Sequence, residues 1–295
     1  MKGRTVAIDI KSLSRELPVL IAGPTASGKS ALAMALAARD GRVIVNADAL
    51  QVYDCWRVLS ARPSRADEVA LPHALYGHIG RDTAYSVGHW LRELRGFLSQ
   101  KIVIVGGTGL NFTALTKGLA EIPETPPEVR MDADARARRD GIGALLAELD
   151  KSTAARIDPA NPARVQRAWE VLRATGRGLA DWQDSTGPAL LPRADCEAVV
   201  IVPDVAWLNT RIDARFDTMM AQGALDEVRA ALPHWHANQP WARAIGAREL
   251  IAHLRGDIGL DAAVQAATAA SRQYAKRQRT WFRSQMRDWQ QITLP

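Results

Sequence analysis

The sequence predicts an α/β fold: a P-loop NTPase-like parallel sheet core flanked by helices, with an all-helical insertion domain. Three observations predict it: a complete phosphate-binding motif near the start, an alternation of apolar strands and helices, and a long charged helical stretch after a cluster of prolines. Strands that alternate with helices form parallel sheets with right-handed crossovers. A chain of 295 residues can form one large domain or two modest ones.

The phosphate-binding motif fills the pattern G-x-x-x-x-G-K-[ST] completely. An apolar segment at 17–22 precedes it with the length of a buried strand, and strong helix formers follow at 31–38. In this setting the backbone N–H groups of the loop and the positive end of the following helix bind phosphate. Lys29 supplies a positive charge for the outer phosphate, and Ser30 supplies a hydroxyl ligand for Mg²⁺. The predicted phosphate or diphosphate site comprises Gly23, Pro24, Thr25, Ala26, Ser27, Gly28, Lys29 and Ser30.

Short apolar segments predict three more strands of the same sheet, at residues 42–46, 101–105 and 198–202. Each has the composition of a strand that is buried on both faces. Helices separate these strands, and the spacing of apolar side chains identifies them. We expect helices from Ser86, from Thr108, over 205–219, ending near Leu250, and over 260–286.

Two polar residues follow the predicted strands, at the sheet edge where ligands bind in parallel α/β proteins. Asp48 is the one carboxylate at the exit of the second strand, so it is a candidate general base or Mg²⁺ ligand. Its alternative role is to cap a helix or a loop. Thr108 follows Gly106 and Gly107, which let a ligand approach closely. Its hydroxyl could contact a phosphate or start the next helix.

A domain boundary is indicated at 121–127, where three prolines fall within five residues. From Glu128 to about Trp182 the pattern is helical and dense in charge, with no strand-like segment. The predicted domains are therefore a P-loop catalytic core, residues 1–122 with 197–295, and a helical insertion, residues 123–196.

Basic side chains are spaced along several predicted helices, and the net charge is +6. Arg211 and Arg215 lie one turn apart after the last strand, where they could form a second cationic clamp on a diphosphate. No acidic residue lies between Asp261 and Asp288 to pair with the basic row on the final helix. Such faces could simply be solvated, but several of them favour an extended polyanion over a small acid. The other basic groups are Arg164 with Arg167, Arg243 with Arg248, and the row Arg272, Lys276, Arg279 and Arg283.

The remaining composition excludes several classes of protein. Cys55 and Cys196 are far apart in the sequence, which fits a reducing compartment and argues against a disulfide scaffold. No apolar segment reaches membrane-spanning length and no signal-peptide pattern follows Met1, so we expect a cytoplasmic protein without membrane association. The six histidines show no convincing metal-binding pattern.

In this setting the sequence resembles the tRNA dimethylallyltransferases, prenyl transferases that isopentenylate the adenosine next to the anticodon. The resemblance runs in order from about residue 17 to 284 and begins with the Gly23–Ser30 loop. None of the later matching stretches is specific to the family by itself, but the order in which they all occur is highly specific. These stretches are Asp48–Tyr53, Val105–Leu110, Ile122-Pro123 with Pro127–Arg130, Asn161–Ala168, Arg215-Phe216 with Met219 and Gly223, Arg243–Gly246, and Ala275–Gln278 with Trp281.

The resemblance implies that the core binds dimethylallyl diphosphate while the insertion grips the anticodon stem-loop of tRNA. The target adenosine would be flipped out of its stack, as is usual for enzymes that modify bases. The Gly23–Ser30 loop, with Mg²⁺ at Ser30, would hold the diphosphate that leaves, assisted by Arg215. Asp48 would be the general base that takes a proton from the exocyclic amine, and Thr108 would contact the transferring end.

The resemblance also implies which residues contact tRNA, and a monomer is expected because one tRNA can occupy both domains of one chain. These residues follow the strand exit at Asp48, lie on the insertion, or precede the helix near Leu250. They are Asp48, Ala49, Leu50, Gln51, Thr108, Arg130, Ala163, Arg164, Val165, Gln166, Arg167, Arg243, Ala244, Ile245, Gly246, Ala247 and Arg248.

Two other functions share parts of this pattern. A small-molecule or nucleoside kinase has the same loop and an acidic residue after the second strand, and its lid could be mistaken for the insertion. A non-catalytic, nucleotide-regulated RNA-binding module would share the loop and the basic faces. The two differ from a prenyl transferase in whether they turn over ATP, the prenyl donor or neither.

Overall fold

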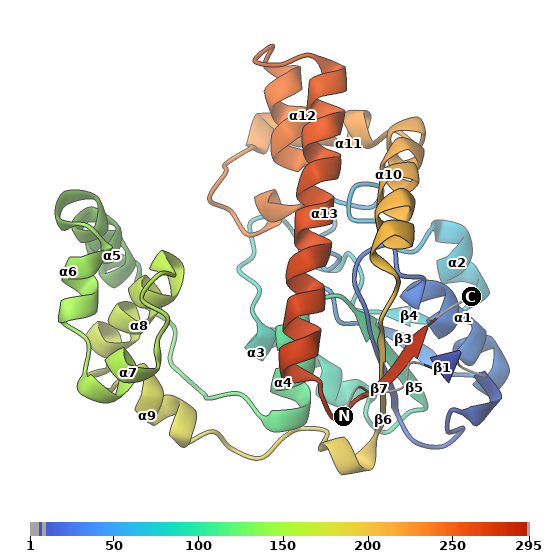
Figure 1. The fold of residues 1–295 in the computed structure, drawn as a ribbon, viewed down its shortest axis with the longest axis horizontal. Coiled ribbons are helices and arrows are strands. Elements are labelled where there is room, and N and C mark those ends of the chain that lie inside the picture. Colours follow the sequence, from blue (N-terminus) through green and yellow to red (C-terminus); the bar gives the residue numbers. More distant parts are fainter. Residues whose placement is uncertain (1–5, 8–9, 294–295) are drawn as a thin grey trace. The chain divides into compact units, whose positions relative to one another are not determined.

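The computed structural model describes residues 6–7 and 10–293, and the chain divides into two compact units (Figure 1). The core unit contains the described residues up to Thr116 and from Leu190 onward, and the insertion unit is Lys117–Ala189. These unit boundaries lie a few residues before the predicted domain boundaries at 122/123 and 196/197. Leu191 accounts for the second difference, because it is buried in the core and its N–H donates to the carbonyl of Leu115 over 3.0 Å.

The described strands of the core form one parallel sheet in the order β1-β7-β6-β2-β5-β3-β4. The four predicted strands are confirmed, with ends that differ from the predicted ones by one or two residues. Three strands were not predicted, because β1 and β4 are two residues long and β7 begins with two glutamines. The expected polar lead-in covers residues 1–15, of which 1–5 and 8–9 lie outside the described residues. The bounds are β1 Val6–Ala7, β2 Val19–Ala22, β3 Val43–Asn46, β4 His73–Ala74, β5 Ile102–Gly106, β6 Glu197–Ile201 and β7 Gln290–Thr293.

Helices cover both faces of the sheet, because alternate side chains of the buried strands point to opposite faces. Val19 and Ile21 of β2 pack with the apolar side of α1 (Lys29–Asp40). Leu20 and Ala22 pack with α3 (Val87–Leu94), α4 (Gly109–Lys117) and the last turns of α13 (Leu260–Gln285). Every central strand is therefore buried on both sides, which explains its continuous apolar sequence.

A further helical layer extends beyond the carboxyl ends of the strands (Figure 1). It contains α10 (Val205–Ala221), α11 (Ala224–Ala231), α12 (Ala247–Leu254) and the first half of α13. Its apolar core includes Trp56 and Trp241, and the indole of Trp56 donates to the carbonyl of Trp241 over 2.8 Å. This layer also packs on the segment after Asp48, so it supports the edge where the predicted site residues lie. The short helix α2 (Arg65–Ala70) belongs to that same segment.

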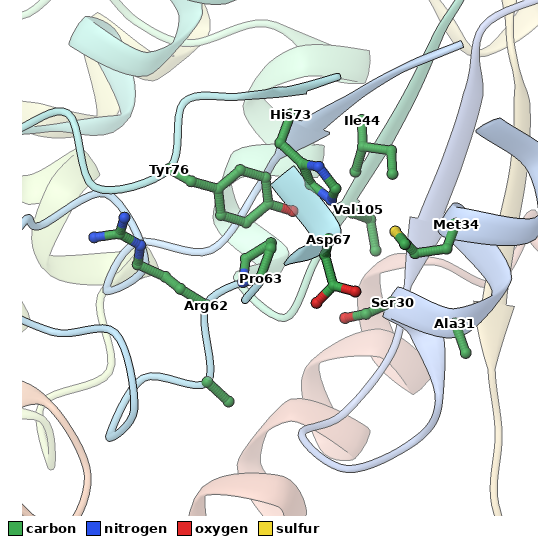
Figure 2. A pocket seen from close by; sticks show the side chains of 11 residues that line it. Ser30, Ala31, Met34, Ile44, Arg62, Pro63, Asp67, His73, Tyr76 and Val105 are labelled. Carbon is green, nitrogen blue, oxygen red and sulfur yellow. The ribbon is translucent and has the colours of Figure 1, made fainter. Parts of the chain in front are cut away.

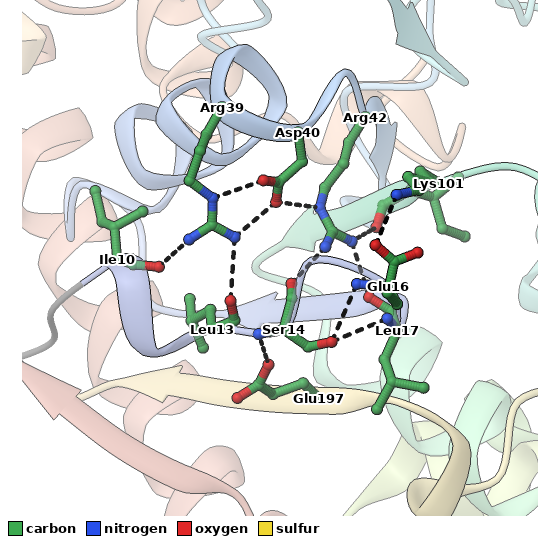
Figure 3. Close-up of polar contacts among 11 residues, drawn as sticks. Ile10, Leu13, Ser14, Glu16, Leu17, Arg39, Asp40, Arg42, Lys101 and Glu197 are labelled. Carbon is green, nitrogen blue, oxygen red and sulfur yellow. Dashed lines mark hydrogen bonds and ion pairs between the residues drawn. The ribbon is translucent and has the colours of Figure 1, made fainter.

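An ion-pair network locks α1 to the amino ends of the strands (Figure 3). Arg42 has no exposed surface, and it donates to the carboxylate of Asp40 and to the carbonyls of Leu17 and Ile102. Hydrogen bonds from Arg39 hold the pKa of Asp40 well below its usual value, at about 2, so this carboxylate stays ionised at neutral pH.

The insertion unit is all-helical over its described elements, as predicted. A small core holds these helices together, built from Ala133, Leu145, Val165 and Trp169. Asn161 and Asp150 cap two of the helices through their side chains. The helices are α5 Pro127–Asp140, α6 Ile142–Ala147, α7 Lys151–Arg156, α8 Pro162–Thr175 and α9 Leu179–Asp184.

Candidate active site

The phosphate loop connects β2 to α1 and has the open backbone that anion binding requires. Gly28 caps α1 with φ of 91°, a left-handed conformation that glycine adopts without strain. Ala26 also has a positive φ, 61°, and its carbonyl accepts a hydrogen bond from Nε of Arg211 over 3.0 Å. Within the described chain, the buried hydroxyl of Ser27 has no hydrogen-bond partner. A phosphate oxygen in the loop would supply that missing partner.

Two cations converge on this loop. Lys29 begins α1, and its Nζ lies 3.4 Å from the carbonyl of Pro24. Arg215, from α10, donates to the hydroxyl of Thr25 over 3.2 Å. The pKa of Lys29 is lowered to about 8, chiefly by burial and then by the positive charge of Arg215, against the opposing effect of Asp48. Two positive charges that lie close together and are partly buried favour the binding of an anion. A bound anion in turn favours the charged form of Lys29.

The side chain of Asn46, the last residue of β3, fixes the backbone of Asp48 just after the strand. The buried side chain of Asn46 accepts a hydrogen bond from the Asp48 N–H over 2.8 Å and donates to the Asp48 carbonyl over 3.0 Å. The carboxylate itself accepts only one backbone bond that the structure records, from the N–H of Leu50 over 3.1 Å. Trp90 fixes the same strand end by donating to the Asn46 carbonyl. The carboxylate thus keeps free acceptor capacity, which a general base needs.

Thr108 is hydrogen-bonded to the two residues that flank Asp48. Its hydroxyl accepts a hydrogen bond from the N–H of Ala49 over 2.9 Å, and its own N–H approaches the carbonyl of Ala47. A Cβ on Gly107 would lie 2.2 Å from the amide nitrogen of Gln278 and 3.3 Å from a carboxylate oxygen of Asp48, so a larger residue here would displace the Gln278 side chain. The two strand exits therefore form one continuous surface.

One cavity brings two of the three predicted catalytic residues, Asp48 and Arg215, together with the phosphate loop, whereas Thr108 is not among its lining residues. The cavity has a volume of about 70 Å³, and Thr25, Lys29, Asp48 and Arg215 all line it. Apolar side chains supply much of the remaining wall, so charges in the cavity are poorly screened by solvent. The other lining residues are Leu50, Gln51, Leu59, Ser60, Phe216, Met219, Ala244, Ile245, Ser271 and Tyr274.

A larger cavity of about 260 Å³ adjoins the other side of the first turn of α1. Figure 2 shows the hydroxyl of Ser30 and the carboxylate of Asp67 lying toward one another across it. In the part of the chain that the structure describes, no group of three or more His, Cys, Asp or Glu side chains could hold a metal ion. The pair formed by the Ser30 hydroxyl and the Asp67 carboxylate fits Mg²⁺, because this ion keeps several waters and uses one or two protein oxygens together with substrate phosphates.

Most of the predicted tRNA-contact residues of the core fall into two groups. Leu50, Gln51, Ala244 and Ile245 line the small cavity, as does Asp48. Exposed positions near the cavity are Ala49, Arg243 and Arg248. Gly246 and Ala247 belong to neither group: both are buried, Gly246 has a φ of 90°, and a Cβ there would lie 2.9 Å from the ring of Phe216.

Predicted contact residues of the insertion unit cluster on α5 and α8. Arg130, Ala163 and Arg164 are exposed. Glu170 is 4% exposed and lies between basic residues, 3.9 Å from Arg130 and 3.8 Å from Arg167. Gln166 donates to the same carboxylate over 3.1 Å. Val165, which was also predicted as a contact, has no exposed surface, and its side chain packs in the core of the insertion.

The sequence pattern missed two features of α13. Arg272 pairs with Asp213 of α10 at 3.2 Å, so the basic row has an acidic partner from another helix. Gln278 is buried and reaches both the phosphate loop and Gly107. Its polarity on the packing face of a helix was the available signal, since a buried amide requires partners.

Fold and site together define a P-loop protein with a helical insertion, in which a cationic phosphate loop adjoins a carboxylate with free acceptor capacity. Comparison with known families agrees with this class. The family model described as IPP transferase matches residues 51–285, and the one described as isopentenyl transferase matches residues 18–73. This chain belongs to the IPP transferase family, as its resemblance predicted.

Individual relatives match over nearly the whole chain. The tRNA dimethylallyltransferase of Cereibacter sphaeroides is 67% identical over 97% of this chain and 92% of its own, and that of Dinoroseobacter shibae is 64% identical over 95% and 96%. Among solved structures, the tRNA isopentenylpyrophosphate transferase of Bacillus halodurans superposes with a TM-score of 0.65 at 27% identity, covering 95% of this chain and 89% of that chain. A eukaryotic dimethylallyltransferase acting on tRNA shares the fold, with a TM-score of 0.75 at 24% identity over 90% and 69%.

Within residues 6–7 and 10–293, no helix combines the length and the apolar character that a crossing of the bilayer requires.

Proposed function

We propose that this chain transfers the dimethylallyl group of dimethylallyl diphosphate to the exocyclic amine of the adenosine that follows the anticodon of tRNA. The observation that carries this proposal is that Lys29, Arg215 and Asp48 line one cavity. An anion site for a leaving diphosphate thereby adjoins a base for an incoming amine. Relatives that are 64–67% identical carry the name tRNA dimethylallyltransferase, which supports the choice of substrates.

The reaction breaks the bond between the first allylic carbon and the diphosphate oxygen, and it forms a bond from that carbon to the amine nitrogen. Negative charge develops on the departing diphosphate, which Lys29, Arg215 and the backbone N–H groups of the loop stabilise. The amine loses one proton, which Asp48 accepts. The products are isopentenyladenosine in the tRNA and free diphosphate.

Mg²⁺ is the cofactor that we propose, held by the hydroxyl of Ser30 with Asp67 facing it. When bound there, the ion would neutralise part of the charge on the diphosphate. The buried Ser27 hydroxyl is available to a phosphate oxygen whether or not Mg²⁺ is bound.

The tRNA contacts follow from exposed and basic residues in each unit. On the core, Ala49, Arg243 and Arg248 are exposed beside the lining of the small cavity. On the insertion, Arg130 and Arg164 are exposed and suited to phosphate contacts. We expect a monomer, because one chain carries both the transfer site and the basic faces. We also expect the protein to act in the cytoplasm.

Incubation with isotopically labelled donors tests this function. Labelled dimethylallyl diphosphate should transfer its label to unmodified tRNA, and tRNA that is already modified at this adenosine is the control that should stay unlabelled. Labelled ATP, with tRNA or with nucleosides, should transfer nothing. Phosphate transfer from ATP to a small acceptor would instead identify a kinase, and tRNA binding without any transfer would identify a binding module.

A further inference from the structure

Gln278 connects the two loops that carry the reacting groups. It lies on α13 and is 5% exposed. Its amide oxygen accepts a hydrogen bond from the N–H of Thr25 in the phosphate loop over 2.9 Å. Its amide nitrogen donates to the carbonyl of Gly107 after β5, also over 2.9 Å. One carboxamide therefore bridges two strand exits, and only one orientation of the amide satisfies both bonds.

The bridge continues to Asp48 through the next residue of the chain. Thr108 follows Gly107, and its hydroxyl accepts a hydrogen bond from the N–H of Ala49, the neighbour of Asp48. A Cβ on Gly107 would lie 3.3 Å from a carboxylate oxygen of Asp48, so the backbone of Gly107 passes directly beside that side chain. Gln278 thus joins the loop that holds the anion to the surface that holds the base.

The helix that carries Gln278 is firmly placed. Ala275 and Phe282, about one turn before and after it, are both buried. Ala275 packs with Ala26 of the phosphate loop, and Phe282 packs in the core beneath the sheet. A side chain that is fixed by its helix and by two hydrogen bonds is suited to hold loops at a set separation. The buried position also makes each bond costly to lose, because the loop groups would be left without partners.

We propose that Gln278 is a positioning residue that sets the distance between the diphosphate cradle at Lys29 and the carboxylate of Asp48. This inference rests on the proposed function, because the distance matters only when the two sites hold two reacting substrates. Each half-site has its own local support: Arg215 and Arg211 at the phosphate loop, and Asn46 at Asp48. Loss of the bridge should therefore misalign the reacting atoms while leaving each substrate bound.

Gln278→Met tests the bridge, because methionine is similar in size and cannot form either hydrogen bond. We expect kcat for prenyl transfer to fall by about 10- to 100-fold, the effect of a misplacement of about 1 Å. The KM for the donor and the Kd for inorganic diphosphate should change by less than about threefold, since each half-site remains. Gln278→Glu keeps the acceptor for Thr25 but loses the donor to Gly107, so its kcat should fall similarly and its diphosphate affinity should also fall, because it adds a negative charge.

The matched control is Thr268→Val on the same helix. Thr268 is 8% exposed and its hydroxyl bonds only to the Val264 carbonyl of its own helix, so this variant perturbs α13 without touching a loop. It should leave kcat within about twofold of the wild type. A kcat for Gln278→Met that also stays within about twofold, or a loss matched by an equal loss of folded protein, would overturn the proposal.

Hydrogen exchange on the wild-type protein provides a readout that does not depend on any variant folding. The Thr25 amide should be protected in the free protein, because Gln278 is its recorded partner. Exchange of that amide at the rate of an unstructured peptide would overturn the bridge. If the wild type transferred no prenyl group, the proposed function would fail, while this exchange rate and diphosphate binding would still decide whether Gln278 holds the loop.

Discussion

Arg215 donates a hydrogen bond to the hydroxyl of Thr25 over 3.2 Å, although 190 residues separate the two in the sequence. Arg211, one turn earlier on α10, bonds the carbonyl of Ala26 in the same way. Two successive residues of the phosphate loop are thus held by one helix from the far end of the core. The loop motif alone supplies one cation, Lys29, and the fold brings the second.

The uncommitted carboxylate of Asp48 leads to the first prediction. Asp48→Asn keeps the size of the side chain and its acceptor for the Leu50 N–H, but it removes the base. We expect kcat for prenyl transfer to fall by about 10²- to 10⁴-fold while the Kd for tRNA changes little. Single-turnover transfer of labelled donor and a filter-binding assay measure the two quantities. Asp54→Asn, at an exposed acid six residues further along the chain, is the control and should leave both quantities unchanged. A kcat for Asp48→Asn close to that of the wild type would show that Asp48 is not the general base.

The lowered pKa of Lys29 leads to the second prediction. Burial and the charge of Arg215 bring it to about 8 in the free protein, so at pH 8 about half of the molecules carry a neutral Lys29. A bound diphosphate favours the charged form and raises this pKa, so binding should take up protons near pH 8 from this residue and take up none from it near pH 6. Titration calorimetry in buffers of different ionisation enthalpy measures the uptake.

Lys29→Arg is the control for that measurement, because arginine keeps its charge at every accessible pH. Diphosphate itself exchanges protons on binding, and the difference between wild type and Lys29→Arg isolates the contribution of Lys29. Identical proton uptake by the two proteins at pH 8 would show that Lys29 is already fully charged in the free state.

The buried network around Arg42 leads to a stability prediction (Figure 3). Arg42→Met leaves the Asp40 carboxylate and the carbonyls of Leu17 and Ile102 without this donor. We expect the free energy of unfolding to fall by about 3–5 kcal/mol, as for a broken buried ion pair. Urea denaturation measures this change.

Lys101→Met is the matched control for Arg42→Met. Lys101 pairs with Glu16 at 3.0 Å, but the two side chains are 46% and 78% exposed. Its loss should cost less than about 1 kcal/mol. Equal effects of the two substitutions would mean that burial does not determine the strength of these contacts.

Exposed arginines of the insertion lead to the last prediction. Arg164→Ala should weaken tRNA binding and reduce the slope of log affinity against log salt concentration by about 1, since one phosphate contact releases about one counterion. Arg156→Ala is the control, because Arg156 is on the same unit but pairs with Asp184 at 2.7 Å. Binding measured between low and moderate salt should separate the two; the same slope for both variants would exclude Arg164 from the interface.

Much of the architecture follows from local sequence. The Gly23–Ser30 motif, the apolar strands and the prolines after Glu121 determined the P-loop sheet and a helical insertion, because strand burial and loop chemistry depend on residues that are close in the chain. The exact unit boundary did not follow, since Leu191 belongs to the core through contacts with α4 rather than through its neighbours.

Tertiary structure alone decided how the site is assembled. Local patterns nominated Asp48, Lys29 and Arg215 separately, and only packing placed them around one cavity. The same packing buried Val165 and Ala247, which a contiguous motif had assigned to tRNA, and it aimed Gln278 at two loops. The physical reason is that periodicity tells which side of an element is apolar, whereas the partners of a polar side chain depend on distant segments that meet only in the folded protein.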